Sequence, residues 1–523
     1  MMRQGRPTRP GDTEALPADE FETFSGHRGL QHEEPLIFEQ DAAGRSGVDL
    51  PEPRTDLPDR LGTLKRRGAV GLPGLSEPQV MRHFVRLSQM NYAIDAGLYP
   101  LGSCTMKHNP RLNEKMARLP GFADIHPLQP QASVQGALEL MAEVGRWLCA
   151  LTGMPAVALS PKAGAHGELC GLMAIRAALD ARGETRNRVL APESAHGTNP
   201  ATAAMCGYTV DPIPADARGR VDMAGLREKL GPDVAAIMVT NPNTCGLFET
   251  DILEMADAIH AAGGYFYCDG ANFNALVGRV RPGDLGIDAM HINLHKTFST
   301  PHGGGGPGAG PVVFSDALAA YAPLPLVQKS QSGEFSLVEQ LDDASADTAF
   351  GRMTAFHGQM GMFVRAYAYM LSHGADGLRQ VAEDAVLSAN YIQASLEADM
   401  SASYPGPCMH ECLFDDRFLK DTGVSTLDFA KAMIDEGYHP MTMYFPLVVH
   451  GALLIEPTET ESRDALDQFI AVLQSLARDA KAGNSARFTG APYLTPRGRL
   501  DETKAARKPV LRWQPPAPAE AAE

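Results

Sequence analysis

The run Val234-Ala-Ala-Ile-Met-Val-Thr240 is apolar up to its last residue and leads directly into the polar loop Asn241-Pro-Asn-Thr-Cys-Gly246. A short apolar run without polar alternation predicts a strand that is buried on both faces. Residues 252–262, which follow the loop, have the spacing of a helix. This stretch therefore predicts one strand–helix unit of an α/β protein.

The same alternation of apolar runs and helical stretches extends in both directions from this unit. The further predicted strands are 156–159, 189–191, 208–210, 265–268 and 289–293. The helical stretches between them are 167–181, 199–206 and 223–230. Strands that alternate with helices predict an α/β fold with a mostly parallel sheet, whose ligands bind beyond the carboxyl ends of the strands.

The length of 523 residues predicts more than one domain. Residues 1–60 are rich in Pro, Arg and acids around one apolar island, 36–38, and predict a partly disordered N-terminal arm. The alternative is that this arm docks on a neighbour through the island. We expect a large α/β domain at 61–369, a smaller α+β domain at 370–485 that opens with an amphipathic helix at 378–396, and a C-terminal extension and tail at 486–523.

Charge and cysteine content exclude several classes of protein. The chain has 63 acidic against 46 basic residues and a net charge of −17, which argues against nucleic acid or an anionic membrane as partner. No apolar run approaches the ~18 residues of a membrane span, and we expect a cytoplasmic enzyme. The eight cysteines form no CxxC pair and read as free thiols. Cys408-Met-His-Glu-Cys412 only superficially resembles a metal motif, because in a strand its ligands would alternate between faces, so we expect no metal.

The stretch Asn293-Leu-His-Lys-Thr-Phe-Ser-Thr-Pro-His-Gly-Gly-Gly-Gly-Pro-Gly-Ala-Gly310 follows the last predicted strand. Lys296 lies between this strand and the glycine-rich loop, where a partly desolvated amine can form a Schiff base. The alternative is a surface lysine beside a flexible spacer. Because the loop lies between two apolar runs, we favour the first interpretation, with glycines that let the backbone approach a ligand or a neighbouring chain.

Asp269 directly follows the apolar run 265–268. A single Asp in this position is most often a turn or cap residue. Together, Asp269 and Lys296 are the two groups that pyridoxal phosphate (PLP) requires, since the lysine holds the aldehyde as an imine and the carboxylate keeps the pyridine nitrogen protonated. The pair is far more specific than either residue alone.

The turn Ser160-Pro-Lys-Ala-Gly-Ala-His-Gly167 lies between a predicted strand and a predicted helix. The free N–H groups and the dipole at a helix N-terminus bind anions, which makes this turn a candidate phosphate site. Small residues before a helix are also common for packing reasons alone.

Two further loops at strand ends carry candidate side chains. His196, in Ser194-Ala-His-Gly-Thr-Asn-Pro200, has the chemistry to stack on a planar cofactor or to move a proton, or it simply packs in its loop. For Asn241 we consider two interpretations: its side chain hydrogen-bonds a substituent on the ring of a planar cofactor, or it only stabilises its own turn.

The sequence around Lys296 resembles glycine dehydrogenase (decarboxylating), the P protein of the glycine cleavage system. The similarity covers about Glu34 to Trp513. The similar blocks are Glu34–Glu39, Leu101–Lys107, Gly164–Glu168, Ser194–Pro200, Thr240–Glu249, Asn293–Gly310, Ile455–Thr458 and Leu500–Lys508. Since the one-chain form of this family is about twice as long, the chain resembles subunit 2 of the split bacterial form.

The resemblance implies a PLP-dependent transferase of fold type I, with a seven-stranded type of sheet. It assigns Lys296 as the Schiff-base lysine, Asp269 as the partner of the pyridine nitrogen, and His196 as the residue stacked on the ring and a candidate for proton transfer. Further cofactor contacts follow from the same resemblance: Gly164, Ala165 and His166 at the phosphate, together with Asn241 and Ala271.

The activity implied by the resemblance is the decarboxylation of glycine through a PLP external aldimine. CO2 is released and the aminomethyl group passes to the lipoyl arm of the H protein. The family further implies an α2β2 heterotetramer with subunit 1. Many type I enzymes place a Ser or Thr shortly before the lysine to hold phosphate, whereas Asn293 and His295 stand there in this chain, so other groups must share that role.

Two alternatives to this activity stay open at this point. One is a different type I activity, such as an aminotransferase or a lyase. The other is a regulatory or scaffolding subunit that binds PLP without turnover, against which the presence of both Lys296 and Asp269 argues.

Overall fold

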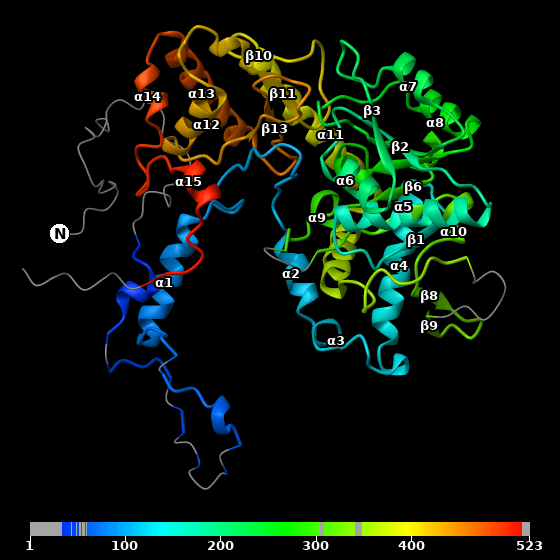
Figure 1. Cartoon of the computed structure of the whole chain (residues 1–523), viewed down its shortest axis with the longest axis horizontal. Coiled ribbons are helices and arrows are strands. Elements are labelled where there is room, and N and C mark those ends of the chain that lie inside the picture. Colours follow the sequence, from blue (N-terminus) through cyan, green and yellow to red (C-terminus); the bar gives the residue numbers. More distant parts are fainter. Residues whose placement is uncertain are drawn as a thin grey trace, which may run out of the picture.

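The computed structural model describes residues 34–514 apart from 43, 49, 52–53, 55–57, 59, 69, 304–307 and 340–347. Its main feature is a seven-stranded sheet in the order β1-β7-β6-β5-β4-β2-β3 (Figure 1). The strands are β1 (Ala156–Ala158), β2 (Arg188–Pro192), β3 (Thr209–Ile213), β4 (Val234–Thr240), β5 (Tyr265–Asp269), β6 (Ala289–His291) and β7 (Val312–Phe314). Only β7 runs antiparallel to its neighbours, so the expected mostly parallel α/β sheet is confirmed.

Successive side chains of the central strands pack into different apolar clusters on the two faces of this sheet. In β4, Ile237 and Val239 join the cluster that contains α4, α8 and the first part of α11, whereas Met238 joins the cluster of α5 and α6. The helices are α4 (Gln135–Thr152), α5 (Gly164–Ala181), α6 (Thr198–Met205), α8 (Ile252–Ala261) and α11 (Met360–Leu396). Burial on both faces explains why these strands are apolar throughout rather than alternating.

The large domain also holds short elements around this sheet. They are α2 (Arg111–Ala117), α3 (Pro120–Ala123), α7 (Met223–Lys229), α9 (Leu294–Thr297), α10 (Asp316–Ala319) and a hairpin of β8 (Leu326–Lys329) and β9 (Phe335–Val338).

A second sheet, in the order β10-β11-β13-β12, has helices packed against it and a core of its own. Its strands are β10 (Ser401–Ala402), β11 (Cys412–Asp415), β12 (Thr442–Met443) and β13 (Leu453–Ile455). The helices that contribute to this core include α12 (Thr426–Asp435), α13 (Arg463–Lys481) and α14 (Ser485–Thr489). The short helix α15 (Glu502–Arg507) follows in the C-terminal extension and has no buried residue. Figure 1 shows α12, α13 and α14 gathered away from the large sheet.

The helix expected at 378–396 is the second part of α11, which begins at Met360 and is interrupted at Gly374, where φ is 63°. The large core extends along α11 to Ala382, and the small core begins at Ala389. The boundary expected from the sequence at 369/370 falls inside this helix. We therefore propose that α11 is shared by both domains, with the change of core between these two alanines.

The described part of the N-terminal arm packs against its own chain. The carboxylate of Glu34 contacts Arg86 and His83 of α1 (Glu77–Met90), and the Phe38 ring stacks on Trp513 with 5.0 Å between centroids. The sequence predicts partial disorder for the arm at residues 1–60, of which residues 1–33 lie outside the described residues, as do 515–523. Among the helices described, none has the length and apolar character needed to cross a membrane.

Candidate active site

The sequence-predicted residues come together beyond the carboxyl ends of the parallel strands. Asp269 is the last residue of β5, Thr240 is the last residue of β4, and Lys296 follows β6 on the short helix α9. Because parallel strands end at one edge of a sheet, residues far apart in sequence meet there. They line a cavity of about 290 Å³ whose walls include Gly164, Ala165, His196, Ala271, Asp269 and Lys296.

The amine of Lys296 is held by the backbone of a distant loop. The side chain is largely buried, and its Nζ donates to the carbonyl oxygen of Ser103 at 2.7 Å. Ser103 adopts the left-handed conformation with φ of 62°, which is uncommon for a non-glycine residue. The 101–107 loop therefore forms a wall of the cavity opposite the sheet.

Asp269 is buried at the base of the cavity. Its carboxylate accepts from the Asn199 side chain at 3.0 Å and from the Ala271 backbone N–H at 2.9 Å, and lies 3.3 Å from the ring of His291. Burial raises the pKa of Asp269, but electrostatic interactions with His291 and Lys296 and the two hydrogen bonds outweigh burial, so that the pKa lies below its ordinary value. The carboxylate is thus kept ionised inside the protein.

Three further histidines surround the lysine side of the cavity. Burial lowers the pKa of His291 and of His302, and burial and the nearby His302 lower the pKa of His295 to about 3. Burial thus disfavours the charged form of all three imidazoles that line the cavity.

The N-terminus of α5 faces the same cavity. Gly164 and Ala165 belong to its first turn, where backbone N–H groups have no acceptor within the helix. The glycines of the loop after Lys296 allow close backbone approach here: a Cβ on Gly310 would lie 2.2 Å from the Ala163 carbonyl oxygen, and one on Gly308 would lie 2.5 Å from that of Lys162. The loop residues 304–307 themselves lie outside the described residues.

Two of the predicted cofactor residues do not line the cavity. The ring of His166 accepts from the backbone N–H of Lys162 at 3.2 Å. The side-chain oxygen of Asn241 accepts from the backbone N–H of Glu249 at 3.0 Å, so this side chain closes its own loop. His196 is exposed at the cavity rim, where a ring nitrogen contacts the Thr198 hydroxyl at 2.8 Å. Its ring and that of Phe445 form a T-shaped pair with 5.8 Å between their centroids.

Other lining residues were not singled out from the sequence. Glu168, one turn into α5, accepts from the hydroxyls of Thr198 and Thr202, and burial and the charge of Asp269 raise its pKa to about 7. Arg279, Arg281 and Arg352 have the charge to bind a substrate carboxylate but do not line the cavity. They form ion pairs elsewhere: Arg279 with Glu383, Arg281 with Asp284 and Arg352 with Glu339.

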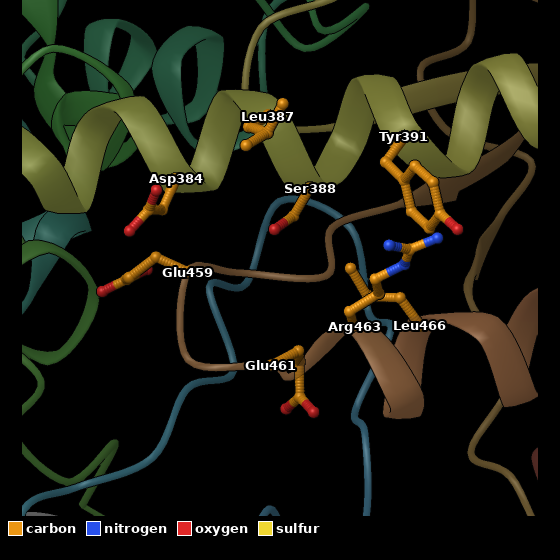
Figure 2. A pocket seen from close by; sticks show the side chains of 8 residues that line it. All are labelled: Asp384, Leu387, Ser388, Tyr391, Glu459, Glu461, Arg463 and Leu466. Atoms are coloured by element: carbon orange, nitrogen blue, oxygen red, sulfur yellow. The ribbon is translucent and has the colours of Figure 1, made fainter.

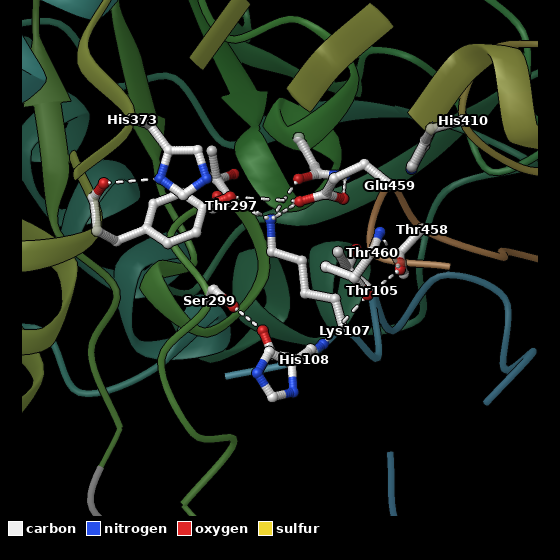
Figure 3. A network of polar contacts seen from close by, with 12 residues as sticks. Thr105, Lys107, His108, Thr297, Ser299, His373, His410, Thr458, Glu459 and Thr460 are labelled. Carbon is white, nitrogen blue, oxygen red and sulfur yellow. Dashed lines mark hydrogen bonds and ion pairs between the residues drawn. The ribbon is translucent and has the colours of Figure 1, made fainter. Parts of the chain in front are cut away.

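A buried ion pair, Lys107–Glu459, contacts the chain next to Lys296. Lys107 Nζ donates to Glu459 at 2.6 Å, to Asn274 at 2.9 Å and to the Thr297 carbonyl at 3.0 Å, next to Lys296 in the chain (Figure 3). Glu459 also lines a more open cavity between α11 and the start of α13, with Asp384 and Glu461 among its other walls (Figure 2). That cavity lies away from the strand ends and contains none of the candidate residues.

Comparisons with known proteins agree with this arrangement. The family described as aminotransferase class-V matches residues 171–317, and the one described as glycine dehydrogenase, C-terminal domain, matches residues 381–491. The crystal structure of a glycine decarboxylase (P-protein) of the glycine cleavage system, in inhibitor-bound form, aligns with a TM-score of 0.65 and 22% identity over 83% of this chain and 92% of that one. A sphingosine-1-phosphate lyase from Burkholderia pseudomallei aligns with a TM-score of 0.59 and 14% identity over 83% and 97%.

The seven-stranded sheet and these structural neighbours define the class, which is that of PLP-dependent enzymes of fold type I. A probable glycine dehydrogenase (decarboxylating) subunit 2 from Caulobacter vibrioides is 70% identical over 99% of both chains. One from Desulforamulus reducens is 50% identical over 92% of this chain and 99% of its own. The chain belongs to the family of glycine dehydrogenase (decarboxylating) subunit 2.

The cavity fits the cofactor that this class implies. Four of its buried polar atoms lack a hydrogen-bond partner among the described residues: Ser103 Oγ, Thr240 Oγ1, Asn272 Oδ1 and Asn293 Oδ1. Buried polar atoms without partners are costly, and a polar ligand would satisfy them. With a lysine amine, an ionised carboxylate and a helix N-terminus on the same cavity, the donor set is one that PLP requires.

Proposed function

We propose that this chain decarboxylates glycine with PLP bound at Lys296, releases CO2 and passes the aminomethyl group to the lipoyl arm of the H protein. The observation that carries the proposal is that Lys296 and Asp269 face one cavity at the carboxyl ends of the strands. PLP, when bound, supplies an electron sink for the bond to the substrate carboxylate.

The residues of this chain would divide the work of binding between them. Lys296 would hold the cofactor aldehyde, and Asp269 would face the pyridine nitrogen. Gly164 and Ala165, at the N-terminus of α5, would hold the phosphate through backbone N–H groups, with His166 completing the turn through its own backbone rather than its ring. Ala271 lines the wall beside Asp269, and Asn241 would act through the shape of its loop.

Two side chains of the cavity are candidates for moving protons, His196 at its rim and Lys296 inside it. His196, at the exposed rim, would cover the ring of the cofactor and can exchange protons with solvent. The Nζ of Lys296, inside the cavity, would be the second candidate for moving a proton. The rings of His291 and His295, which line the cavity, would help to exclude water and so protect against protonation at the wrong atom.

The test of the lysine uses a matched substitution. Lys296→Ala, produced with subunit 1, should lose the absorption band of the bound cofactor and the glycine-dependent exchange of CO2. Lys115→Ala, at an exposed lysine of α2, is the control and should keep both. Full activity of Lys296→Ala would contradict the proposed role.

The proposed acceptor and partner require separate measurements. Turnover of glycine should depend on lipoylated H protein, and H protein without the lipoyl group should not support it. Turnover of glycine or other amino acids without any lipoyl arm would favour a different fold type I activity. Subunit 1, co-expressed with this chain, should form an α2β2 complex by mass measurement, and a stable, fully active lone chain would contradict it.

A further inference from the structure

Three buried side chains of the small sheet lie behind the 101–107 loop. His410 and Glu411 directly precede β11, Glu456 directly follows β13, and all three have no exposed surface. A ring nitrogen of His410 and one carboxylate oxygen from each glutamate all lie within 4.8 Å of one another. His410 and Glu411 belong to the Cys408–Cys412 stretch, to which the proposed function gives no role.

The two glutamates hold the backbone of the 101–107 loop. Glu411 Oε2 accepts from the Ser103 N–H at 2.8 Å, and Glu456 accepts from the Thr105 N–H at 2.8 Å and from its hydroxyl at 2.5 Å. Ser103 and Thr105 are both in the left-handed region, with φ of 62° and 49°. This strained backbone persists only where its surroundings fix it, and the glutamates supply those contacts.

The chain of contacts continues from Glu411 to the catalytic lysine. The N–H of Ser103 binds Glu411, and the carbonyl of Ser103 accepts from Lys296 Nζ at 2.7 Å. A displacement of Ser103 would therefore displace the acceptor of the lysine amine.

The hydrogen bonds distinguish the two carboxyl groups. Both oxygens of Glu456 accept hydrogen bonds from Thr105, which favours the ionised form of Glu456. Glu411 Oε1 and both ring nitrogens of His410 have no hydrogen-bond partner among the described residues, and His410 Nε2 lies 3.8 Å from Glu456 Oε1. Because two adjacent buried anions are unfavourable, a proton on this pair of carboxyl groups is better accommodated at the free Oε1 of Glu411 than on Glu456.

We propose that Glu411 is a neutral carboxylic acid in the folded protein and acts as a positioning residue that holds the Ser103 carbonyl against Lys296. Its importance for turnover rests on the proposed function. A single negative charge, on Glu456, then remains behind the loop, where it balances the charge of the lysine.

The surrounding charges agree with this location of the proton. Burial and the charge of Glu456 hold the pKa of Glu411 well above its ordinary value, although the Ser103 N–H and Lys296 act in the opposite direction. Burial lowers the pKa of His410 and so disfavours a charged ring, although the charge of Glu456 acts in the opposite direction. The other titratable groups that interact with the cluster are Glu459, His302, Cys104, Cys245, Cys408 and Cys412.

The variants that test this are Glu411→Gln and Glu411→Ala. Gln keeps an uncharged acceptor for the Ser103 N–H, whereas Ala removes it. Glu456→Gln is the matched control: it presents an NH2 group to a position that needs two acceptors, so it should lower the melting temperature although Glu411→Gln does not.

The first measurement is the infrared difference spectrum of wild type minus Glu411→Gln on the cofactor-free full chain at neutral pH. It should show the carbonyl band of a protonated carboxylic acid. The second is the rate at which an amine-selective acylating reagent modifies Lys296, followed by peptide mass analysis. This rate should be within about threefold of wild type in Glu411→Gln and change by about tenfold or more in Glu411→Ala.

Absence of the carboxylic-acid band would overturn the proposal, and so would equal effects of the Gln and Ala variants on lysine reactivity. A stoichiometric metal ion in wild type that Glu411→Gln loses would also overturn it, because the cluster would then bind a cation rather than a proton. These measurements need neither cofactor nor glycine. Their results would therefore be the same if the proposed function were wrong, so failure of this proposal can be distinguished from failure of the proposed function.

Discussion

The ion pair between Lys107 and Glu459 offers a quantitative test of how the site is supported. The Lys107 side chain has no exposed surface and the Glu459 side chain is 6% exposed, with 2.6 Å between Nζ and Oε1. Lys107→Met leaves the carboxylate without its cation, and Glu459→Gln leaves the ammonium group without its anion. Figure 3 shows that the Lys107 ammonium group also donates to the Thr297 carbonyl, so Lys107→Met removes a hydrogen bond that holds α9, the helix of Lys296.

Breaking a buried ion pair by removing one partner typically costs about 3–5 kcal/mol, because the remaining charge stays buried and uncompensated. Glu459→Gln should fall near the lower end, because the Gln carbonyl and the oxygens of Asn274 and Thr297 still accept from Lys107. The double variant buries no uncompensated charge. Its loss of stability should therefore be smaller than the sum of the single losses by about 1–3 kcal/mol.

The assay is urea unfolding of the full chain for wild type, both single variants and the double variant, compared through midpoints and slopes. Activity measured on the same four proteins reports whether losing the hydrogen bond between Lys107 and the Thr297 carbonyl changes the position of Lys296. Strictly additive losses of stability would refute the reasoning, since they would mean that the two charges do not compensate each other in the folded protein.

Two further predictions concern packing and pH. A Cβ on Gly171 of α5 would lie 2.3 Å from the Tyr267 ring, so Gly171→Ala should cost about 1–3 kcal/mol in thermal melting. Gly136→Ala, in the first turn of α4 with nothing within 4 Å, is its control and should be neutral or stabilising by up to about 1 kcal/mol. Burial and Asp269 raise the pKa of Glu168 from 4.5 to about 7, so the folded protein binds this proton more tightly than the unfolded chain. Stability should therefore fall as pH rises from about 4.5 through 7, and Glu168→Gln should flatten that part of a melting-temperature series; an unchanged pH profile would contradict the assigned shift.

Much of the fold could be predicted because its signals are local. The apolar run at 234–240 became β4, and the runs at 265–268 and 289–293 became β5 and β6. Strand ends also located Lys296 and Asp269, since chemistry in a parallel sheet collects where the strands end. The beginning of α11 at Met360 was not predicted, because a helix that crosses two cores has no single apolar stripe.

The site residues that escaped prediction owe their place to long-range contacts. Ser103 is 193 positions from Lys296, and Glu411 is 308 positions from Ser103. No spacing rule links positions that far apart. Asn241 shows the converse limit: its loop was located correctly, but the turn directs its side chain to the Glu249 backbone.

The sequence alone thus determined the class of sheet, the strand ends and the residue types gathered there, because hydrophobic periodicity and turn chemistry act over a few residues. The tertiary structure decided which backbone carbonyl accepts from the Lys296 amine, in which histidines burial lowers the pKa, and where two buried glutamates lie close together. Those properties depend on burial and on distances between segments far apart in the chain, and packing sets both.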